Sequence, residues 1–136
     1  MGNIKKNIVS EYNISTSQAV ETGRTLFGIV KKYSFMLIYN ITFLVADKVS
    51  DQWVQWVNNS HIPEMVASGY FTEPRLAKVL SDHGQEGTSY SVQYHVADMQ
   101  ELGAWHRKFG SAMERNCASL FGEDVLLFTT VLELIK

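Results

Sequence analysis

The sequence has one cysteine, two prolines and a net charge close to zero, and these scarcities exclude several classes of protein. Cys117 alone cannot form an internal disulfide, and a metal site needs more ligands than one thiolate. No run of about 18 apolar residues occurs, so no segment is expected to span a membrane. A formal net charge of −2 lacks the basic excess that nucleic acid binding requires. We therefore expect a cytoplasmic protein without metal or cofactor, and without nucleic acid or membrane partners.

The sequence does contain enough apolar material for a core. Of its 136 residues, 46% are hydrophobic and 12% aromatic, which is typical of one globular domain rather than of a disordered chain. Residues 1–35 differ from the rest, because their apolar residues are scattered among polar ones. We predict an N-terminal extension over 1–35, loosely ordered or with a short helix at 17–32, and a compact domain over 36–136.

Strand-like and helix-like patterns alternate along the predicted domain. β-Branched and aromatic residues predict four strands, and apolar residues spaced three and four apart predict two helices. The predicted strands are 36–45, 70–81, 88–97 and 125–135, and the predicted helices are 49–68 and 98–121. This βαββαβ order is typical of an α+β, ferredoxin-like fold, in which one four-stranded antiparallel sheet carries both helices on one face. The right-handed crossover rule gives the strand order 4-1-3-2.

Single residues predict further details of the two helices. Pro63 lacks a backbone N–H and crowds the preceding turn, which predicts a break or a kink near His61. Asp47 or Ser50 is expected to cap the first helix, and Asp98 the second. The predicted buried stripe of the second helix consists of Met99, Leu102, His106, Phe109, Met113, Cys117 and Leu120.

The first and last predicted strands are apolar on both faces, which predicts a dimer. Two helices can cover only one face of the sheet, and an uncovered apolar face would exceed the patch that monomers usually expose. On the first strand, one face carries Met36, Ile38 and Leu44 and the other Leu37, Tyr39, Ile41, Phe43 and Val45. On the last strand, Val125, Leu127 and Val131 lie opposite Leu126, Phe128, Leu132 and Leu134. We expect a homodimer in which two sheets pack face to face, forming a dimeric α/β barrel. The alternative is that residues 1–35 cover this face.

Several segments resemble a family of short, uncharacterised bacterial proteins defined only as a domain of unknown function. The matching segments are M-L-I-Y-N-I-T at Met36, W-V-Q-W at Trp53, H-I-P-E-M at His61, G-Y-F-T at Gly69, G-T-S-Y-S-V-Q-Y at Gly87 and F-T-T-V-L-E at Phe128. The resemblance implies that the native chain starts near Met36. The fold is also similar to the wider dimeric α/β-barrel group of cofactor-free oxygenases, isomerases, dismutase-like haem proteins and binding modules. Fold alone does not choose among these activities.

Four residues are candidates for a ligand site. His61 lies where the first helix is predicted to break, and its imidazole suits acid–base chemistry or ligand binding. Tyr39, Asn40 and Gln93 lie on two strands that neighbour each other in this topology, so we expect them to line the same cavity as His61. The alternatives are that His61 bonds a free helix carbonyl, and that Tyr39 and Gln93 lie satisfied in a dimer core.

Two functions are compatible with this pattern. The first is a homodimeric binding or interaction module whose cavity holds a small apolar or aromatic molecule. The second is a cofactor-independent enzyme of the oxygenase or isomerase kind, with His61 as acid or base. Among the other histidines, we expect His106 to be a core or partly covered residue and His83 and His95 to be solvated. We expect Cys117 to be a small buried apolar residue.

Overall fold

The computed structural model describes residues 2–4, 6–7, 36–81 and 86–135. They belong to two compact units, Met1–Met36 and Leu37–Lys136. In the first unit, strand β1 (Gly2–Ile4) pairs in parallel with strand β2 (Lys6–Asn7). The helix predicted near the N-terminus lies outside the described residues.

The second unit contains four strands and two helical runs in the predicted order. The strands are β3 (Leu37–Val45), β4 (Thr72–Lys78), β5 (Thr88–Val96) and β6 (Val125–Glu133). The first run joins the short turn η1 (Asp47–Val49), helix α3 (Ser50–Trp56), the π-helical turn η2 (Val57–His61) and helix α4 (Ile62–Ala67). The second run joins helix α5 (Met99–Trp105), the π-helical turn η3 (His106–Gly110), helix α6 (Ser111–Phe121) and the short turn η4 (Gly122–Asp124). The four strands are antiparallel in the order β4-β5-β3-β6, which confirms the ferredoxin-like prediction.

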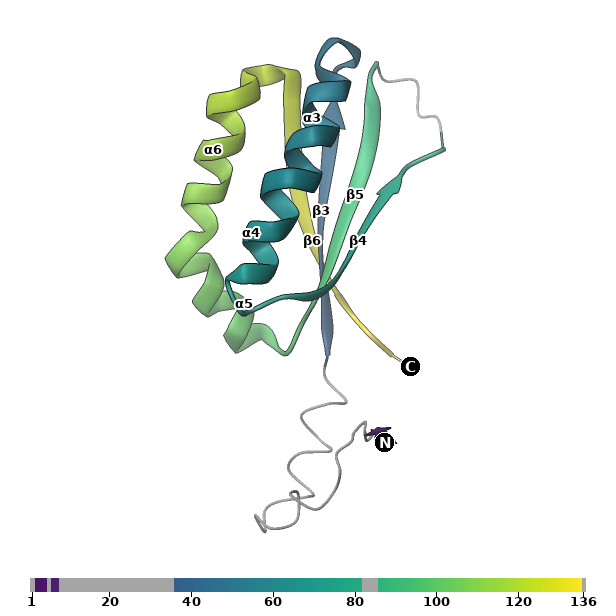
Figure 1. Cartoon of the computed structure of the whole chain (residues 1–136), viewed down its shortest axis with the longest axis vertical. Helices are drawn as coiled ribbons and strands as arrows, with labels where there is room; N and C mark the ends of the chain where they lie inside the picture. The colour runs from purple at the N-terminus through teal and green to yellow at the C-terminus, as the bar shows by residue number, and fades with distance from the viewer. Residues whose placement is uncertain (1, 5, 8–35, 82–85, 136) are drawn as a thin grey trace. The chain divides into compact units, whose positions relative to one another are not determined.

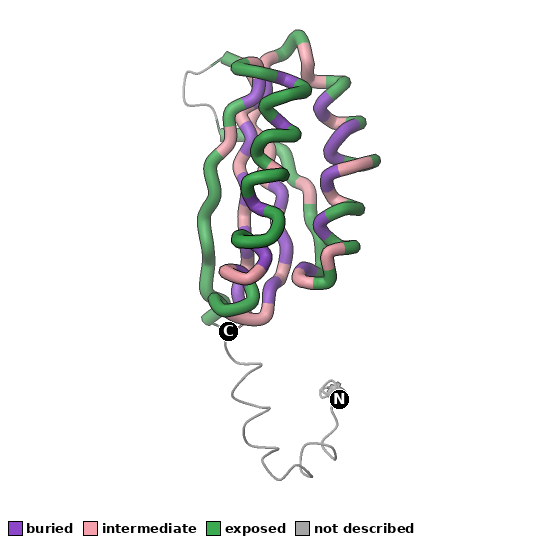
Figure 2. Tube along the Cα trace, turned by 90° about the vertical axis from the view of Figure 1, so that its left-hand side faces the viewer, coloured by how far each residue is buried: buried purple, intermediate pink, exposed green. Residues whose placement is uncertain are grey.

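Both helical runs cover the same face of the sheet (Figure 1). Along β3 every second residue from Leu37 to Val45 is buried, and the residues between them are partly exposed. In β5, Val92, Tyr94 and Val96 share the buried face. This alternation is expected because successive side chains of a strand point to opposite faces. The core therefore lies between the sheet and the helices, where Figure 2 shows buried residues on both layers.

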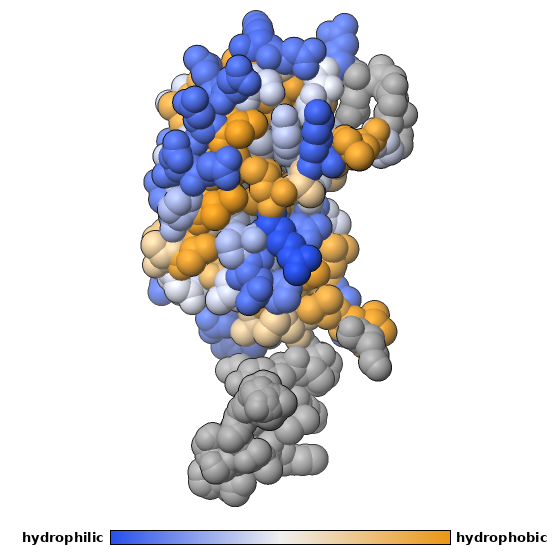
Figure 3. All heavy atoms as spheres, turned by 45° about the vertical axis from the view of Figure 1, so that its right-hand side comes forward, coloured by the Kyte–Doolittle hydropathy of each residue, from blue (hydrophilic) through white to orange (hydrophobic). Residues whose placement is uncertain are grey.

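Strand β4 forms one edge of the sheet, as its proline and charged residues predict. Its pairing with β5 shifts between Thr72 and Arg75, and Glu73 there has a φ of 55°. This bulge interrupts the ladder next to Pro74, which has no N–H to donate. Figure 3 brings the β4 side forward and shows strongly hydrophilic side chains between smaller hydrophobic patches. Such an edge discourages pairing with another strand.

The first helical run continues through Pro63 instead of breaking before it. His61 keeps right-handed helical backbone angles, with φ −64° and ψ −55°, and α4 begins directly after it. In a regular α-helix the ring of Pro63 would press on the carbonyl four residues earlier. The wider turn η2 lies at this point and relieves the crowding. Of the break or kink predicted near His61, the break is therefore wrong, and a π-helical turn takes its place.

The caps of the two helical runs differ. The amide of Glu101 donates to Oδ1 of Asp98 at 2.9 Å, which confirms the predicted cap of the second run. The cap position of α3 falls on Val49, whose side chain has no polar atom to offer. The prediction that Asp47 or Ser50 caps the first helix is therefore wrong, because the short turn η1 leads the chain into α3.

The predicted buried stripe of the second helix is only partly right. Leu102 and Cys117 are buried, and Trp105 joins them on the buried face. The exposed members of the stripe are Met99, His106, Phe109 and Leu120. The π-helical turn η3 changes the spacing locally, so that Trp105 and Gly110 are buried where the α-helical count places His106 and Phe109. His106 is therefore not the core or partly covered residue that the sequence predicts.

The face of the sheet opposite the helices, here called the open face, is apolar along β3 and β6. Strand pairing places Ile38 beside Leu132 and Leu44 beside Leu126. Phe128 lies between these pairs on β6 and exposes 62% of its surface. The alternative prediction is that residues 1–35 cover this face. Those residues belong to the other unit, and most of them lie outside the described residues, so this alternative stays a prediction.

The centre of the open face is polar and internally hydrogen-bonded. The side-chain amide of Asn40 donates to the hydroxyls of Thr42 at 3.1 Å and Thr130 at 3.4 Å. Its carbonyl accepts a hydrogen bond from Ser91, whose hydroxyl also accepts one from Gln93 Nε2 at 3.4 Å. These residues satisfy one another within the sheet, so the network fixes their side chains on this face.

Candidate functional site

A pocket of about 610 Å³ lies between the two helical runs. Its volume falls within the range of small-molecule sites, about 300–1,000 Å³. Both π-helical turns border the pocket, since η2 contributes His61 and η3 contributes Phe109. Turns of this kind inside α-helices are frequent at functional sites. The lining residues are Trp56, His61, Glu64, Met65, Ala67, Ser68, Trp105, Phe109, Ala112, Met113 and Asn116.

His61 is the buried polar residue of this pocket, with 2% of its surface exposed. Its ring lies 5.1 Å from that of Trp56, and it meets Phe43 and Tyr94 edge to face at 5.8 and 6.2 Å between ring centroids. Its Nε2 atom has no hydrogen-bond partner among the described residues. Nε2 therefore does not bond a free helix carbonyl, the alternative that the sequence suggested.

Burial sets the charge state of His61. The aromatic surroundings lower the pKa of its imidazole to about 4, because they disfavour the cation. The ring is therefore neutral at pH 7. In that form one ring nitrogen donates a hydrogen bond and the other accepts one.

Two further buried polar atoms lie in the rings around His61. Nε1 of Trp56 and the hydroxyl of Tyr94 have no hydrogen-bond partner within the described ranges. Burial raises the pKa of Tyr94, so its phenol is also neutral. Buried polar atoms of native proteins nearly always have a partner, and each unpaired one costs about 1–3 kcal/mol. Of these atoms, Nε2 of His61 and Nε1 of Trp56 belong to residues that line the pocket, whereas Tyr94, like Trp53 with its unpaired Nε1, is not among the described lining residues. The two lining atoms are available to bond a ligand.

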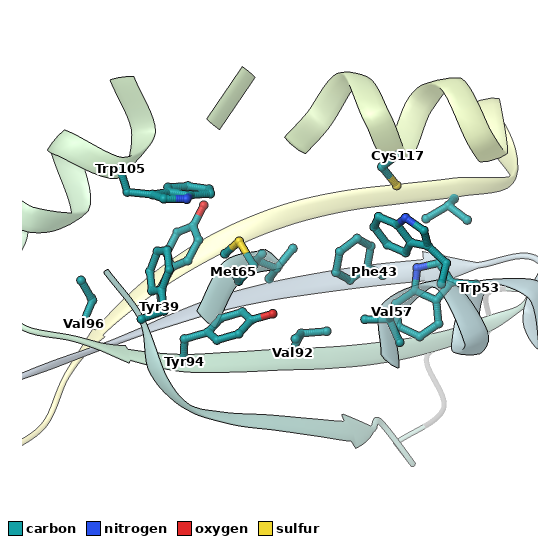
Figure 4. Close-up of a cluster of buried hydrophobic side chains, with 14 of the residues drawn as sticks. Tyr39, Phe43, Trp53, Val57, Met65, Val92, Tyr94, Val96, Trp105 and Cys117 are labelled. Atoms are coloured by element: carbon teal, nitrogen blue, oxygen red, sulfur yellow. The ribbon is translucent and has the colours of Figure 1, made fainter. Parts of the chain in front are cut away.

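The core that supports the pocket is aromatic and is drawn from both layers. In Figure 4 the side chains of Tyr39 and Tyr94 rise from the sheet, and that of Trp105 meets them from the helix side. Tyr39 lies 5.6 Å from Trp105, and Phe71 lies 5.1 Å from it, between ring centroids. An aromatic ring has few rotatable bonds, so the buried ring of Trp105 gives the pocket a firm wall. Met65 is also buried and lines the pocket.

The rim of the pocket is exposed and carries little charge. Glu64 is the only charged lining residue, and no lysine or arginine of the described chain lines the cavity. Beyond the rim, Lys108 Nζ donates to the hydroxyl of Tyr70 at 3.0 Å, and Tyr70 packs against Phe109 at 6.4 Å. This contact links the end of the first helical run to η3. Neighbouring Tyr70 raises the pKa of Lys108.

The structure separates the four predicted site residues by sheet face. Tyr39 and His61 lie on the helix side, whereas Asn40 and Gln93 pair with each other on the open face. Tyr39 does not line the pocket but packs against Trp105, which does. The prediction that all four line one cavity is wrong, because consecutive strand residues point to opposite faces. Burial raises the pKa of Tyr39, and a hydrogen bond to Thr129 opposes that rise.

Several lining residues were missed in the sequence, although a signal for them exists. Trp105, Phe109, Ala112 and Asn116 follow one another at spacings of three and four residues, as on one helical face. This face lies beside the stripe that apolar residues predict, and it ends in a polar residue. Because this helical face combines apolar and polar residues, a search for apolar core positions does not identify it.

The described residues offer little to metal or thiol chemistry. No group of three or more His, Cys, Asp or Glu side chains in 36–81 and 86–135 is placed to hold a metal ion. Burial raises the pKa of Cys117 to about 11, so its thiol is protonated at pH 7. None of the described helices is long and apolar enough to cross a membrane.

The strand order, the single helical layer and the pocket define a ferredoxin-like α+β protein with a site large enough for a small molecule. The chain belongs to the family of the domain of unknown function DUF4286, whose model matches residues 36–135. This match agrees with the resemblance seen in the sequence.

Two solved structures share the fold. One is an ethyl tert-butyl ether d (EthD) family protein from Bacillus halodurans C-125, with 14% identity and a TM-score of 0.56 over 72% of this chain and 98% of that one. The other is a dimeric ferredoxin-like protein from an uncultured marine organism, with 11% identity and a TM-score of 0.52 over 75% of this chain and 96% of that one. At these identities the likeness shows the fold alone. A search of curated proteins gives no match.

Proposed function

We propose that this protein is a small-molecule-binding module whose ligand occupies the pocket between the two helical runs. The observation that carries the proposal is the buried, unpaired Nε2 of His61 in a cavity of about 610 Å³. A pocket with apolar walls and a few polar groups is typical of ligand sites. The aromatic walls formed by Trp56, Trp105 and Phe109 favour an apolar or aromatic ligand.

Binding is favoured over catalysis by the state of His61. General acid–base catalysts work best with a pKa near the operating pH, whereas burial lowers the pKa of this imidazole to about 4. Glu64, the one carboxylate that lines the pocket, is exposed at the rim, and burial alone accounts for the shift of His61. A neutral ring without a partner acid suits hydrogen bonding to a ligand better than proton transfer. The oxygenase or isomerase alternative would need a ligand that raises this pKa.

The binding proposal is tested by filling the pocket from one side. Ala112 lines the pocket on α6, and Ala118 is exposed on the same helix outside it. A library of small aromatic compounds is screened by thermal shift on the native protein, on Ala112→Phe and on Ala118→Phe. A ligand present at ~100 times its Kd stabilises the folded state by about 2.7 kcal/mol. We expect hits that persist in Ala118→Phe and vanish in Ala112→Phe. The absence of hits, or hits that survive in Ala112→Phe, would refute the proposal.

We also propose that a second copy of the chain covers the open face. Exposed Leu126, Phe128 and Leu132 form an apolar strip there, which monomers rarely leave in water. Arg75, at the β4 edge, is the only Lys, Arg, Asp or Glu that the described strand pairing places on this face. A nearly uncharged surface can meet its own copy without repulsion, and two sheets pack well face to face. The ferredoxin-like structure from an uncultured marine organism is described as dimeric, which supports a dimer here.

Two leucines of nearly equal exposure give a matched test of the dimer. Leu126, on the open face, exposes 57% of its surface, and Leu120, on α6, exposes 55%. Leu126→Asp should shift the protein to a monomer in sedimentation velocity, because it places a charge in the sheet-on-sheet contact. Leu120→Asp should remain a dimer. A native protein that sediments as a monomer, or a monomer from Leu120→Asp alone, would contradict the proposed interface.

A further inference from the structure

The charges around the pocket restrict the chemistry of its ligand. Glu64 stands at the rim, and none of the described lining residues is a cation. A carboxylate or phosphate ligand would meet a like charge at the entrance and find no countercharge inside. Burying an anion without a partner is costly, so the pocket disfavours acids.

Among the described residues, the buried end of the pocket offers a cation no carboxylate to pair with. The unpaired buried polar atoms among its described lining residues are Nε2 of His61 and Nε1 of Trp56. The indole N–H can only donate a hydrogen bond, and a donor does not stabilise a cation. Glu64 is the one carboxylate that lines the cavity, and it lies at the exposed rim.

A ligand with an uncharged hydrogen-bond acceptor fits the polar atoms of the pocket. An oxygen placed between these two side chains would accept from Trp56 Nε1, and a neutral His61 can either donate or accept. Pairing these atoms would remove the cost of leaving them unsatisfied. The walls formed by Met65, Trp105 and Phe109 would cover the apolar part of the same molecule.

We infer that the ligand is an uncharged molecule with an apolar or aromatic body and a carbonyl or hydroxyl group that lies against His61. This inference rests on the proposed binding function and adds the chemical class of the ligand. It predicts selection by charge and selection by hydrogen bonding, and the two are measured separately.

Selection by charge is measured with four naphthalene probes of the same ring size. Naphthalene has no head group, 2-acetonaphthone has a neutral carbonyl, 2-naphthoate is an anion, and 2-naphthylmethylamine is a cation at pH 7. Affinities for the native protein are measured by titration calorimetry. The ketone should bind about five-fold more tightly than naphthalene, the increment of one neutral hydrogen bond. Both ions should bind about ten-fold or more weakly than the ketone. An ion that matches or exceeds the ketone would overturn the inference while leaving the binding function in place.

Selection by hydrogen bonding is measured as the affinity ratio of ketone to naphthalene. In His61→Phe this ratio should fall below the native value, whatever the absolute affinities are, because Phe offers no polar atom and only Trp56 Nε1 remains to bond the ketone. His106→Phe is the matched control, since His106 is exposed and does not line the pocket; it should keep the native ratio. Trp56→Phe removes the indole N–H at the pocket wall and should lower the ratio if His61→Phe does not fold. An unchanged ratio in both His61→Phe and Trp56→Phe would overturn the inference. Failure of all four probes, together with an empty library screen, would instead refute the binding function.

Discussion

Acid should destabilise the folded protein through His61. The imidazole is neutral in the folded state, because burial lowers its pKa from 6.5 to about 4. Its ring contacts come from Phe43, Trp56 and Tyr94, of which only Tyr94 titrates, and burial raises the pKa of that phenol. No cation or carboxylate in these contacts opposes the effect of burial on His61.

The sign of the effect follows from proton binding in the two states. Between pH 6.5 and about 4, the unfolded chain holds the proton on residue 61 and the folded chain does not. The stability that His61 contributes by staying neutral is therefore complete above pH 6.5 and is lost as the pH falls toward 4. At about 1.4 kcal/mol per pH unit, the loss amounts to about 3 kcal/mol. For a domain of this size, 1 kcal/mol moves Tm by roughly 4 °C or more, so Tm should fall by roughly 10 °C or more from this group alone.

The assay is urea unfolding at pH 7, 6, 5 and 4, followed by tryptophan fluorescence, on the native protein and on His61→Phe. Other groups also titrate in this range, so the informative quantity is the difference between the two proteins. The variant should gain about 3 kcal/mol relative to the native protein as the pH falls to 4. His106→Phe, at an exposed site, should track the native protein. Equal pH dependence of native protein and His61→Phe would refute the argument that burial keeps this imidazole neutral.

Three further substitutions test the packing. Asp98→Ala removes the acceptor for the Glu101 amide and should lower the free energy of unfolding by about 1 kcal/mol in urea titration; no loss would mean that water replaces the cap. Trp53→Ala empties a fully buried site stacked on Tyr90 at 4.6 Å and should cost about 3–5 kcal/mol, so a loss below 1 kcal/mol would contradict the packing. Gly87→Ala should lower Tm, because Gly87 has a φ of 88° and a Cβ there would lie 2.5 Å from the Val45 carbonyl oxygen; an unchanged Tm would show that this turn relaxes.

Much of the fold was predictable, because periodic patterns report burial directly. The alternation of Tyr90, Val92, Tyr94 and Val96 identifies a strand and its core face, and the structure buries the last three of them. The cap at Asp98 was also predictable, since capping depends on residues close in sequence. An apolar stripe predicts the buried face of a helix less reliably than alternation predicts the buried face of a strand. The π-helical turn η3 changes the spacing of buried positions at His106 and Phe109, and no pattern in the neighbouring sequence predicts such a turn.

The candidate site was predictable only through one residue. His61 was identified because Pro63 follows it, although the helix widens at this point rather than breaking. Asn40 and Gln93 were placed near His61 on strand adjacency alone, and the register puts them on the opposite face. Trp105 and Phe109 reach the pocket from a segment more than forty residues away, a contact that their own neighbours in sequence do not specify.

The sequence by itself determined the strands, their order and the presence of apolar residues on both faces of the sheet, because these follow from periodicity and connection length. Only the tertiary structure decided that His61 is neutral and lacks a partner at Nε2, because the charge and pairing of a buried group depend on the rings that three separate segments place around it.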